Sequence, residues 1–478
     1  MYSPNPPGDR TPVIAVIGGG ASGTLTAVHL LRLAAAGRGG MRIALIDRLG
    51  RHGLGQAYST THPGHLLNSP ADKMSALAGD PGHLLRWARA DGTLGPDAPT
   101  QDVFLPRPAY GRYLCDTLAA AQLAAQPAGT LRLITSQVVR ITCGAPRHPL
   151  RLHLAADGHI DADAAVLATG NLAPGAPCPV PATPRYIADP WAPGALRGAS
   201  DGSPVVVIGT GLTTMDVAIA LADANPRTVV HAVSRHALLP QPHRRGPAAA
   251  GIGWLPVLSD EGGPVRLGEL MWQVRTAVAD RAEYWQDIVD ALRPYTAGLW
   301  QRLPVADQRV FLRHVARYWE VHRHRMPPQT ARRITELRCT RRLSVRAGRV
   351  AGVREVPGGL RVQISEGGTV TEVAAGWLIN ATGPNPDITR TSDRLLRDLF
   401  DRGLARPDPH RLGIDASPAG AVLDAAGRPS NMLFTLGPTL RGLRYETTAI
   451  PEIRDQAALL ALRLTAAAQA PARPSSAA

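Results

Sequence analysis

The sequence predicts an α/β protein with two Rossmann-like domains of the three-layer ββα type and a helical insertion. Three observations support this fold class. Short β-branched runs at residues 13–17 and 204–208 each lead into a glycine-rich turn and then into apolar residues at helical spacing. Each half later closes with an apolar run ending in Ala-Thr-Gly, at residues 168–170 and 381–383. The stretch 267–325 lacks both features and instead indicates helices rich in tryptophan.

These features divide the chain into segments that alternate between the two domains. The first domain is expected from residues 1–190 and 386–464, the second from 200–262 and 336–385, the helical insertion from 263–335, and a disordered tail from 465–478. The tryptophans of the insertion are expected to lie in its core, because large aromatic side chains are mostly buried. They are Trp272, Trp285, Trp300 and Trp319.

The first glycine turn has the composition of a dinucleotide-binding fingerprint. Gly18, Gly20 and Gly23 would allow, in that order, a tight turn, close approach of a pyrophosphate and close packing of helix on strand. The helix that follows directs free N–H groups and the positive end of its dipole at the phosphates. Asp47 ends the next apolar strand and can accept hydrogen bonds from ribose hydroxyls. We therefore expect this domain to bind FAD, although an acid at this position also suits NAD.

The second glycine turn keeps Gly209 and Gly211 but has Thr214 in place of the third glycine. The strand that follows ends in Ser234 and Arg235 instead of an acid. A hydroxyl and a guanidinium at this position could bind the 2′-phosphate of NADPH. The sequence therefore predicts NADPH in preference to NADH. NADH stays open, because Arg235 could instead stack on the adenine.

The composition limits the classes of function. The formal charge is +14, but Lys73 is the only lysine among 52 basic residues, and the arginines are dispersed along the chain. Coding bias and anionic ligands explain this pattern better than a nucleic-acid-binding surface does. We expect a cytoplasmic protein, because no apolar run could span a bilayer and the N-terminus lacks a signal-peptide pattern. The four cysteines form no Cys-x-x-Cys pair, so neither a metal site nor a dithiol relay is expected.

A set of short motifs gives the chain a family resemblance. They are Gly53-Leu-Gly55-Gln-Ala-Tyr58, His65-Leu-Leu-Asn68, Phe104-Leu-Pro-Arg107, Tyr110-Gly-Arg-Tyr113, Asp216, Arg323-His-Arg325, Gly437-Pro438 and Pro451-Glu-Ile-Arg454. In order and spacing, the chain resembles FAD/NAD(P)-binding proteins of the FAD-dependent urate hydroxylase and aspartate N-monooxygenase type. Baeyer–Villiger monooxygenases carry a Phe-x-Gly-x-x-x-His stretch between their two turns. Residues 186–191 differ from that stretch, so membership of that subclass is not expected.

The expected cofactor contacts combine the two fingerprints with positions that the resemblance implies. They are Gly18, Gly20, Ser22, Gly23, Asp47, Asn68, Ser75, Gly170, Gly209, Gly211, Thr213, Ser234, Arg235, Gly383, Gly437, Glu446 and Thr447, and residues 243–245 are a further candidate for the NADPH phosphates. A helix beginning near Thr447 would direct its N-terminus at the flavin pyrimidine carbonyls. Each polar residue could equally serve as a loop cap or turn residue.

The substrate-binding candidates are Arg107, Tyr110, Arg323 and Arg325. Forked guanidinium donors suit carboxylate or urate oxygens, although each arginine could instead form a surface or interdomain salt bridge. No catalytic residue and no metal ligand is predicted.

These observations together predict an FAD-dependent, NAD(P)H-using monooxygenase. A C4a-hydroperoxyflavin would transfer one oxygen atom of O₂ to a small polar or anionic substrate, either urate-like or an amino acid oxidised on nitrogen. Two alternatives stay open: a flavin-dependent NAD(P)H dehydrogenase or reductase without oxygen insertion, and a non-catalytic flavin-binding redox sensor. No nucleic-acid or membrane partner is expected. Substrate identity and oligomeric state are left open by the sequence.

Overall fold

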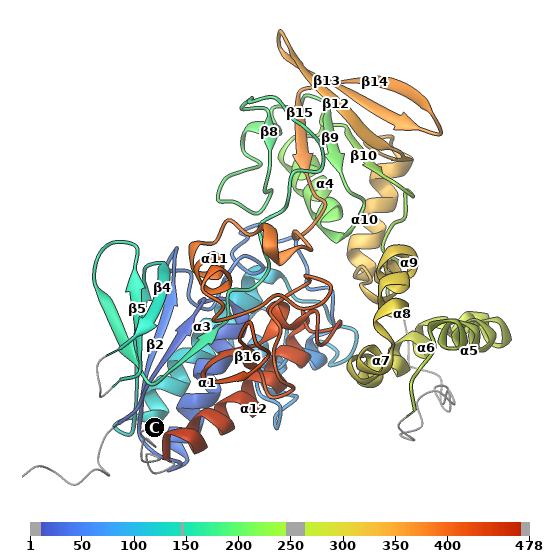
Figure 1. Cartoon of the computed structure of the whole chain (residues 1–478). Helices are drawn as coiled ribbons and strands as arrows, with labels where there is room; N and C mark the ends of the chain where they lie inside the picture. The colour runs from blue at the N-terminus through green and yellow to red at the C-terminus, as the bar shows by residue number, and fades with distance from the viewer. Residues whose placement is uncertain (1–10, 145–147, 245–262, 470–478) are drawn as a thin grey trace, which may run out of the picture.

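The computed structural model describes residues 11–144, 148–244 and 263–469, which form two α/β domains and a group of helices beside them (Figure 1). Each domain is built on a parallel sheet with a three-stranded antiparallel sheet against it. This arrangement confirms the predicted fold class. Within the described residues, no helix combines the length and the apolar character needed to cross a membrane.

The first domain has a six-stranded sheet in the order β16-β17-β7-β1-β2-β3, parallel throughout except between β16 and β17. Its strands are β1 (Val13–Ile17), β2 (Met41–Asp47), β3 (Gly129–Thr135), β7 (Ala164–Leu167), β16 (Ala421–Leu423) and β17 (Pro429–Thr435). The antiparallel sheet consists of β4 (Val138–Cys143), β5 (Leu150–Leu154) and β6 (His159–Ala162). The helices are α1 (Ala21–Ala35), η1 (Ala71–Lys73), α2 (His83–Ala90), α3 (Arg107–Ala125), η7 (Ile388–Arg390), α11 (Arg394–Asp401), η8 (Gly437–Leu440) and α12 (Ile450–Gln469).

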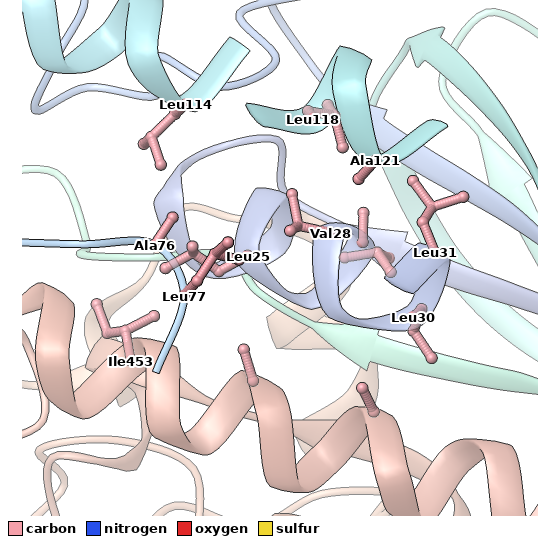
Figure 2. Close-up of a cluster of buried hydrophobic side chains, with 14 of the residues drawn as sticks. Leu25, Val28, Leu30, Leu31, Ala76, Leu77, Leu114, Leu118, Ala121 and Ile453 are labelled. Carbon is pink, nitrogen blue, oxygen red and sulfur yellow. The ribbon is translucent and has the colours of Figure 1, made fainter. Parts of the chain in front are cut away.

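The composition of β1 follows from burial on both faces. Ile14 and Val16 face the helices α1, α3 and α12, whereas Ala15 and Ile17 face the antiparallel sheet. Successive side chains of a strand point to opposite faces, so a strand covered on both sides has no place for a polar residue. Figure 2 shows the helical side of this core. Leu25, on α1, and Ile453, on α12, belong to the same cluster of buried side chains.

The C-terminal part of the chain completes the first domain. Strand β17 pairs with β7 in parallel, with Leu433 opposite Ala165. Helix α12 packs along α1 and continues to Gln469, so residues 465–469 are helical and not the start of a disordered tail as expected. The helix continues because its buried side extends to Leu464 and Thr465, which lie against the core. Residues 470–478 lie outside the described residues.

The second domain repeats the plan, with a five-stranded parallel sheet in the order β11-β10-β9-β15-β8. Its strands are β8 (Tyr186–Ile187), β9 (Val205–Ile208), β10 (Val230–Ser234), β11 (Leu343–Ala347) and β15 (Trp377–Asn380). The antiparallel sheet consists of β12 (Arg349–Val356), β13 (Gly359–Glu366) and β14 (Thr369–Ala375). The helices are η2 (Gly198–Ser200), α4 (Leu212–Ala224) and α10 (Pro328–Cys339).

Two boundaries differ from the expected ones. Strand β8 pairs with β15 of the second sheet, so residues 186–187 lie in the second domain although the first was expected to reach residue 190. Helix α10 buries Ile334 and Leu337 in the core of the second domain, so the insertion ends before α10 and not at residue 335. Parallel strands need a long crossover connection, and α10 supplies part of the one between β10 and β11.

The helical insertion packs around Trp300 and contacts Tyr445 of the C-terminal segment. It consists of α5 (Leu267–Asp280), η4 (Ala282–Tyr284), α6 (Trp285–Leu292), η5 (Arg293–Tyr295), α7 (Thr296–Arg302), α8 (Val305–Val310), the π-helical turn η6 (Phe311–Val315) and α9 (Ala316–Arg323). Trp300 is buried as expected, but Trp272 is 66% exposed, so the expectation of a core position is wrong for that residue. Trp272 lies on α5, which projects from the body of the molecule in Figure 1 and leaves one side uncovered.

Candidate functional site

The first glycine turn joins β1 to α1 with the geometry that a dinucleotide-binding turn needs. Gly18 has φ +114°, and a Cβ there would lie 2.2 Å from the carbonyl oxygen of Ala168. A Cβ at Gly23 would lie 1.9 Å from the carbonyl oxygen of Gly18, so a side chain at Gly23 would push the helix off the strand. Helix α1 begins after Gly20 with no side-chain cap. Its first N–H groups are therefore available to an anion.

Asp47 holds the loops around this turn. One carboxylate oxygen, Oδ2, accepts a hydrogen bond from the N–H of Gly19 at 3.1 Å. The other, Oδ1, accepts from the N–H groups of Leu49 at 2.9 Å and Arg51 at 3.0 Å. The carboxylate thus orders the chain that leaves β2. Its expected contact with a ribose stays a prediction.

The C-terminal segment lies directly against the first turn. Gly437 has φ +71°, and a Cβ there would lie 2.4 Å from Oγ of Ser22. The N–H of Gly437 donates to Oε1 of Gln456 at 2.9 Å, and Oγ1 of Thr447 donates to the carbonyl of Gly437 at 3.2 Å. The fold therefore brings Ser22, Gly437 and Thr447 together from opposite ends of the chain. Helix α12 begins at Ile450, three residues after the expected position.

Two residues predicted to contact a ligand, Ser75 in the loop 68–75 and Tyr110 beside that loop, instead form hydrogen bonds within the protein. Ser75 is fully buried, and its hydroxyl donates to the carbonyl of Asp80 at 2.6 Å. Tyr110 is also fully buried and donates to the carbonyl of Met74 at 2.9 Å. Ser75 therefore acts as a turn residue, and Tyr110 supports the loop from below and does not face a substrate. The partners of Ser75 lie two and five residues further along, which fits the turn role that the sequence left open. The partner of Tyr110 lies 36 residues away, so local sequence could not show it.

Asn68 differs from Ser75 in this respect. Its backbone carbonyl accepts a hydrogen bond from Nε2 of His243 at 2.9 Å, while its side-chain amide has no hydrogen-bond partner within the described residues. His243 therefore contacts the loop of the first domain, which differs from the expected phosphate contact. Arg244 pairs with Asp287 at 2.9 Å, and residue 245 lies outside the described residues. Asn68 stays available as a flavin contact.

The second glycine turn has an open face. Gly209 has φ +120°, and a Cβ there would lie 2.4 Å from the carbonyl oxygen of Ala381. A Cβ at Gly211 would meet no atom within 4 Å, and the same is true at Gly170 and Gly383, where the two Ala-Thr-Gly strands end. Helix α4 begins after Gly211 with no side-chain cap. The turn therefore leaves room for a ligand at the N-terminus of α4.

Ser234 and Arg235 follow β10 beside this turn. The hydroxyl of Ser234 lies 2.8 Å from Oγ1 of Thr210, which itself donates to the carbonyl of Leu238 at 2.6 Å. Arg235 is exposed, and its guanidinium has no partner within the described part of the chain. Thr213 is partly exposed in the first turn of α4. Arg235 is therefore free to meet a charged group of a ligand.

Arg107 joins the two domains through its guanidinium. Its Nη2 donates to Oδ2 of Asp216, on α4, at 2.8 Å, and its Nε donates to the carbonyl of Leu66 at 3.2 Å. The guanidinium also lies 5.3 Å from the ring centre of Trp191. Burial raises the pKa of Asp216 to about 6, although the nearby Arg107 acts in the opposite direction. Of the two roles that the sequence left open, the structure shows the interdomain salt bridge.

Arg325 is also engaged. It is 3% exposed, donates to Oε1 of Gln286 at 2.6 Å and pairs with Asp290 of α6. Burial lowers the pKa of its guanidinium, while Asp290 acts against this change. Arg325 therefore connects α6 with the residues that follow α9.

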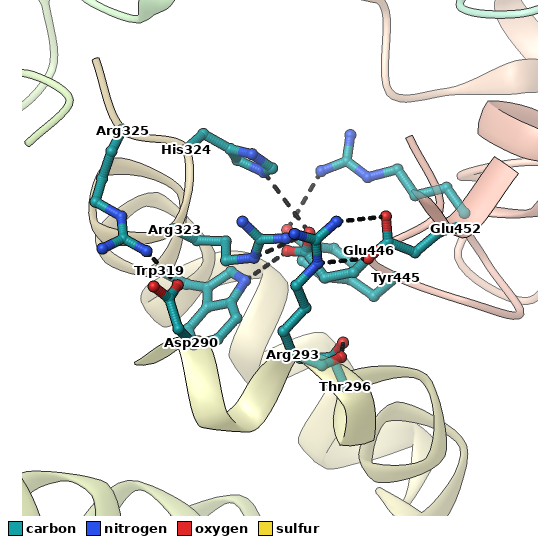
Figure 3. A network of polar contacts seen from close by, with 11 residues as sticks. Asp290, Arg293, Thr296, Trp319, Arg323, His324, Arg325, Tyr445, Glu446 and Glu452 are labelled. Atoms are coloured by element: carbon teal, nitrogen blue, oxygen red, sulfur yellow. Dashed lines mark hydrogen bonds and ion pairs between the residues drawn. The ribbon is translucent and has the colours of Figure 1, made fainter. Parts of the chain in front are cut away.

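Arg323 keeps two buried donor atoms unused within the described residues, compared with one, Nε, in Arg325 (Figure 3). It is 8% exposed, and its Nε lies 3.9 Å from Oε2 of Glu446, which is too long for a hydrogen bond. Neither Nε nor Nη2 of Arg323 has a hydrogen-bond partner in the part of the chain that the structure describes. Buried donors are normally paired, so a guanidinium in this state has unsatisfied binding capacity.

Glu446 is an anion at the centre of the same network. Its Oε1 accepts a hydrogen bond from Nε1 of Trp319 at 2.6 Å, and its Oε2 lies 3.8 Å from Nε2 of His324. Burial alone would raise the pKa of Glu446, but His324, Arg323 and the Trp319 hydrogen bond outweigh it and hold the pKa below its usual value. Glu446, predicted as a cofactor contact, therefore binds the helical insertion instead.

Sequence reasoning missed a second link between the insertion and the C-terminal segment. Arg293 makes a bidentate contact with Glu452 of α12, with N–O distances of 2.7 and 2.9 Å. The two residues are 159 positions apart, and although Glu452 lies in the motif Pro451-Glu-Ile-Arg454, no local pattern pairs it with Arg293. Figure 3 shows this pair beside Arg323 and Glu446, at the junction of the insertion with the start of α12.

Two parallel sheets, each with a glycine turn at the start of an uncapped helix, define a flavoprotein fold with two dinucleotide-binding domains. Residues 15–172 match the family model described as FAD-NAD(P)-binding. This match confirms the expected resemblance to FAD/NAD(P)-binding proteins and the expected class of cofactors. No curated protein matches the sequence.

Solved structures match almost the whole chain at low identity. The ornithine hydroxylase from Pseudomonas aeruginosa in its reduced form aligns with a TM-score of 0.62 and 14% identity, covering 96% of this chain and 100% of that one. The ornithine N-hydroxylase from Kutzneria sp. 744, solved with reduced FAD, NADP⁺ and L-ornithine, aligns with a TM-score of 0.61, 16% identity and coverage of 96% and 100%. The bacillithiol disulfide reductase from Bacillus cereus aligns with a TM-score of 0.52, 12% identity and coverage of 96% and 99%. These likenesses establish the fold, which is shared by monooxygenases and reductases.

Proposed function

We propose that the protein is an FAD-dependent, NADPH-using monooxygenase that hydroxylates a nitrogen atom of a small, amino-acid-like substrate. FAD reduced by NADPH would supply the chemistry by activating O₂. The residues of the chain would bind both dinucleotides, orient the substrate and exclude water. The observation that carries the proposal is the buried Arg323, whose unpaired donors lie beside the segment that contacts the first glycine turn.

The residues around the first turn fit FAD. The uncapped N-terminus of α1 offers N–H groups for a pyrophosphate, and a Cβ at Gly20 would meet only the Cα of Gly55, at 3.5 Å. The side-chain amide of Asn68 is a further polar group that could contact the cofactor, whereas the hydroxyl of Thr447 is already bound to Gly437 and Gln456. These groups would hold the cofactor between the N-terminal and C-terminal parts of the first domain.

The residues around the second turn fit NADPH. The space at Gly211 would admit a pyrophosphate next to the N-terminus of α4. The exposed guanidinium of Arg235, after β10, would pair with the 2′-phosphate that distinguishes NADPH from NADH.

Arg323 would recognise an anionic group on the substrate. A carboxylate accepts two parallel hydrogen bonds from a guanidinium, and this pairing is strong where water is excluded. Amino-acid-like substrates carry such a carboxylate, and the hydroxylases that share this fold include two that are named for ornithine. Glu446 keeps the guanidinium in position at 3.9 Å without using its donors for a hydrogen bond.

A flavin-dependent NAD(P)H reductase is the competing function, because a disulfide reductase shares the fold. A dithiol relay that passes electrons from a flavin to a disulfide uses two neighbouring cysteines. The four cysteines of this chain are all free and belong to separate parts of the fold: Cys115 on α3, Cys143 on β4, Cys178 before β8 and Cys339 on α10. This distribution favours oxygen transfer over a dithiol relay.

The test is NADPH oxidation in air by the FAD-loaded protein, with L-ornithine, L-aspartate and urate as candidate substrates. We expect a hydroxylamine product in proportion to the NADPH consumed. We also expect Arg323→Lys to raise KM for that substrate about tenfold or more, since a bidentate charged contact is lost. Arg317→Lys is the matched control, because Arg317 lies on the same helix in a partly exposed pair with Glu320. Electrons recovered only in H₂O₂ or in an added quinone would support the reductase instead.

A further inference from the structure

Four residues of both domains and of the segment between them form a compact group, which we call the interdomain clamp. It consists of Arg107 at the start of α3, Asp216 on α4, His65 of the first domain and Trp191 in the segment between the domains. Arg107 and Asp216 were both singled out by the motif pattern, but the proposed function gives neither a role. Their side chains are 16% and 7% exposed, so this ion pair is largely screened from water.

The clamp also fixes the backbone that precedes Asn68. Arg107 donates from Nε to the carbonyl of Leu66 at 3.2 Å and from its backbone N–H to the carbonyl of His65 at 2.8 Å. His65 in turn donates from Nε2 to the backbone carbonyl of Asp216 at 3.1 Å. Its Nδ1 lies 2.7 Å from Oγ1 of Thr60, so both ring nitrogens are occupied and the ring is held in one tautomer. One side chain thus ties α4 to the loop that leads to the first cofactor site.

The other charged groups near the Arg107–Asp216 pair are His62, in the loop that leads to His65, and Asp223, on α4. Burial lowers the pKa of His65 to about 4, with His62 and Arg107 acting in the same direction and Asp223 opposing them. His65 is therefore neutral near pH 7, and Arg107 is the one cation that contacts the Asp216 carboxylate within the described residues. A second polar contact crosses the domains nearby, where Nε2 of Gln56 donates to Oδ2 of Asp189 at 3.0 Å.

We propose that Arg107 is a positioning residue, which holds the NADPH-binding domain at a fixed orientation to the loop that borders the FAD site. This inference rests on the proposed use of two cofactors. Hydride transfer needs the reacting atoms about 3–3.5 Å apart, and a displacement of about 1 Å can cost about a hundredfold in rate. Asp216 is the fifth residue of the helix that begins at the second glycine turn, so a shift of α4 moves that turn with it.

The test compares FAD-loaded, full-length variants in two independent measurements. The first is the rate of flavin reduction at saturating NADPH without oxygen, followed by stopped-flow absorbance. The second is hydrogen–deuterium exchange of the backbone in residues 60–68 and in α4, measured without NADPH. We expect Arg107→Met and Asp216→Asn each to slow reduction about tenfold or more and to raise exchange in both segments. The double variant should be no slower than the slower single variant, because both changes break one contact.

Two variants keep the test decisive. Asp216→Asn preserves the shape of the side chain and leaves Arg107 bound to Leu66, so it is expected to fold even if Arg107→Met does not. Arg112→Met is the matched control, because Arg112 lies on the same helix and pairs at 2.7 Å with Asp91 of the same domain. It should leave both measurements unchanged.

Each other outcome overturns the inference. Normal reduction by Asp216→Asn, whether or not exchange changes, would show that the clamp does not position the cofactors. Slow reduction in Arg112→Met as well would show a general effect of charge on α3. The exchange measurement needs no turnover, and reduction by NADPH precedes any use of oxygen. A failure to find hydroxylated product would therefore refute the proposed function and leave this inference standing.

Discussion

Substitution of Gly211 is expected to separate NADPH binding from stability. Its backbone angles, φ −82° and ψ −171°, suit any residue, and a Cβ there would meet no atom within 4 Å. Gly211→Ala should therefore leave the fold intact or stabilise it by about 0.4–1 kcal/mol, because alanine has less freedom in the unfolded chain. The same methyl group would occupy the space proposed for the pyrophosphate. Loss of one hydrogen bond to a charged group costs about 1.5–3 kcal/mol, which corresponds to a roughly tenfold to hundredfold weaker Kd for NADPH.

The assay measures three quantities on the same preparation. Thermal unfolding should give an unchanged or slightly higher Tm, and absorbance should give an unchanged ratio of FAD to protein. The NADPH dependence of anaerobic flavin reduction should show the weaker Kd. Gly209→Ala is the control with the opposite pattern, because φ +120° and a Cβ 2.4 Å from the carbonyl of Ala381 are expected to destabilise the fold by about 1–3 kcal/mol. Normal NADPH affinity in Gly211→Ala would refute the placement of the pyrophosphate.

Three further predictions follow from the same geometry. Arg235→Ala should raise KM for NADPH but not for NADH, measured by initial rates with each cofactor. Tyr110→Phe should lower the free energy of unfolding, measured in urea, by about 1–3 kcal/mol, because loss of the hydroxyl leaves the buried carbonyl of Met74 unpaired. KM values should stay normal. The free energy of unfolding should fall from pH 6.5 to about 4, because burial lowers the pKa of His65 and His243 to about 4 and the unfolded chain takes up the extra protons. Asp216→Asn should steepen that fall, because the raised pKa of this carboxyl makes the folded protein take up a proton in the same range.

Each of these has a result that would count against it. If the ratio of KM for NADPH to KM for NADH is unchanged in Arg235→Ala, Arg235 does not determine which of the two cofactors binds. A stable Tyr110→Phe with an altered KM would return Tyr110 to the substrate site. A pH dependence that is no steeper in Asp216→Asn would mean that its carboxyl is ionised throughout this range.

The fold could be predicted because its signals are local. The run Val13–Ile17, followed by three glycines at fixed spacing, specifies a strand, a turn and a helix within about 20 residues of sequence. The glycine roles at Gly18 and Gly23 follow from the same pattern, since each Cβ would strike backbone atoms that lie close in the fold. Helix α10 was misplaced because the sequence shows a helix there but not which core it packs against.

The polar side chains could be predicted only as candidates. A hydroxyl or guanidinium has the same donors whether it meets a ligand or a carbonyl, and its neighbours come from distant parts of the chain. Arg107 and Asp216 are 109 positions apart, and Trp319 and Glu446 are 127 apart. Arg323 kept its place as a substrate candidate because the fold buries it and leaves Nε and Nη2 without partners in the described residues. No local pattern separates it from Arg325, two residues later, whose Nη1 and Nη2 are both paired and whose Nε alone has no partner in the described residues.

The proposed function requires that the two cofactors serve the transfer of oxygen to a substrate. Its most direct test is turnover of the FAD-loaded protein with NADPH under ¹⁸O₂, with L-ornithine, L-aspartate and urate each supplied in turn. We expect one of these to be converted to a product carrying one ¹⁸O atom, with one NADPH consumed for each product. Complete recovery of the electrons as H₂O₂ or in a quinone acceptor, with no ¹⁸O in any organic product, would contradict it.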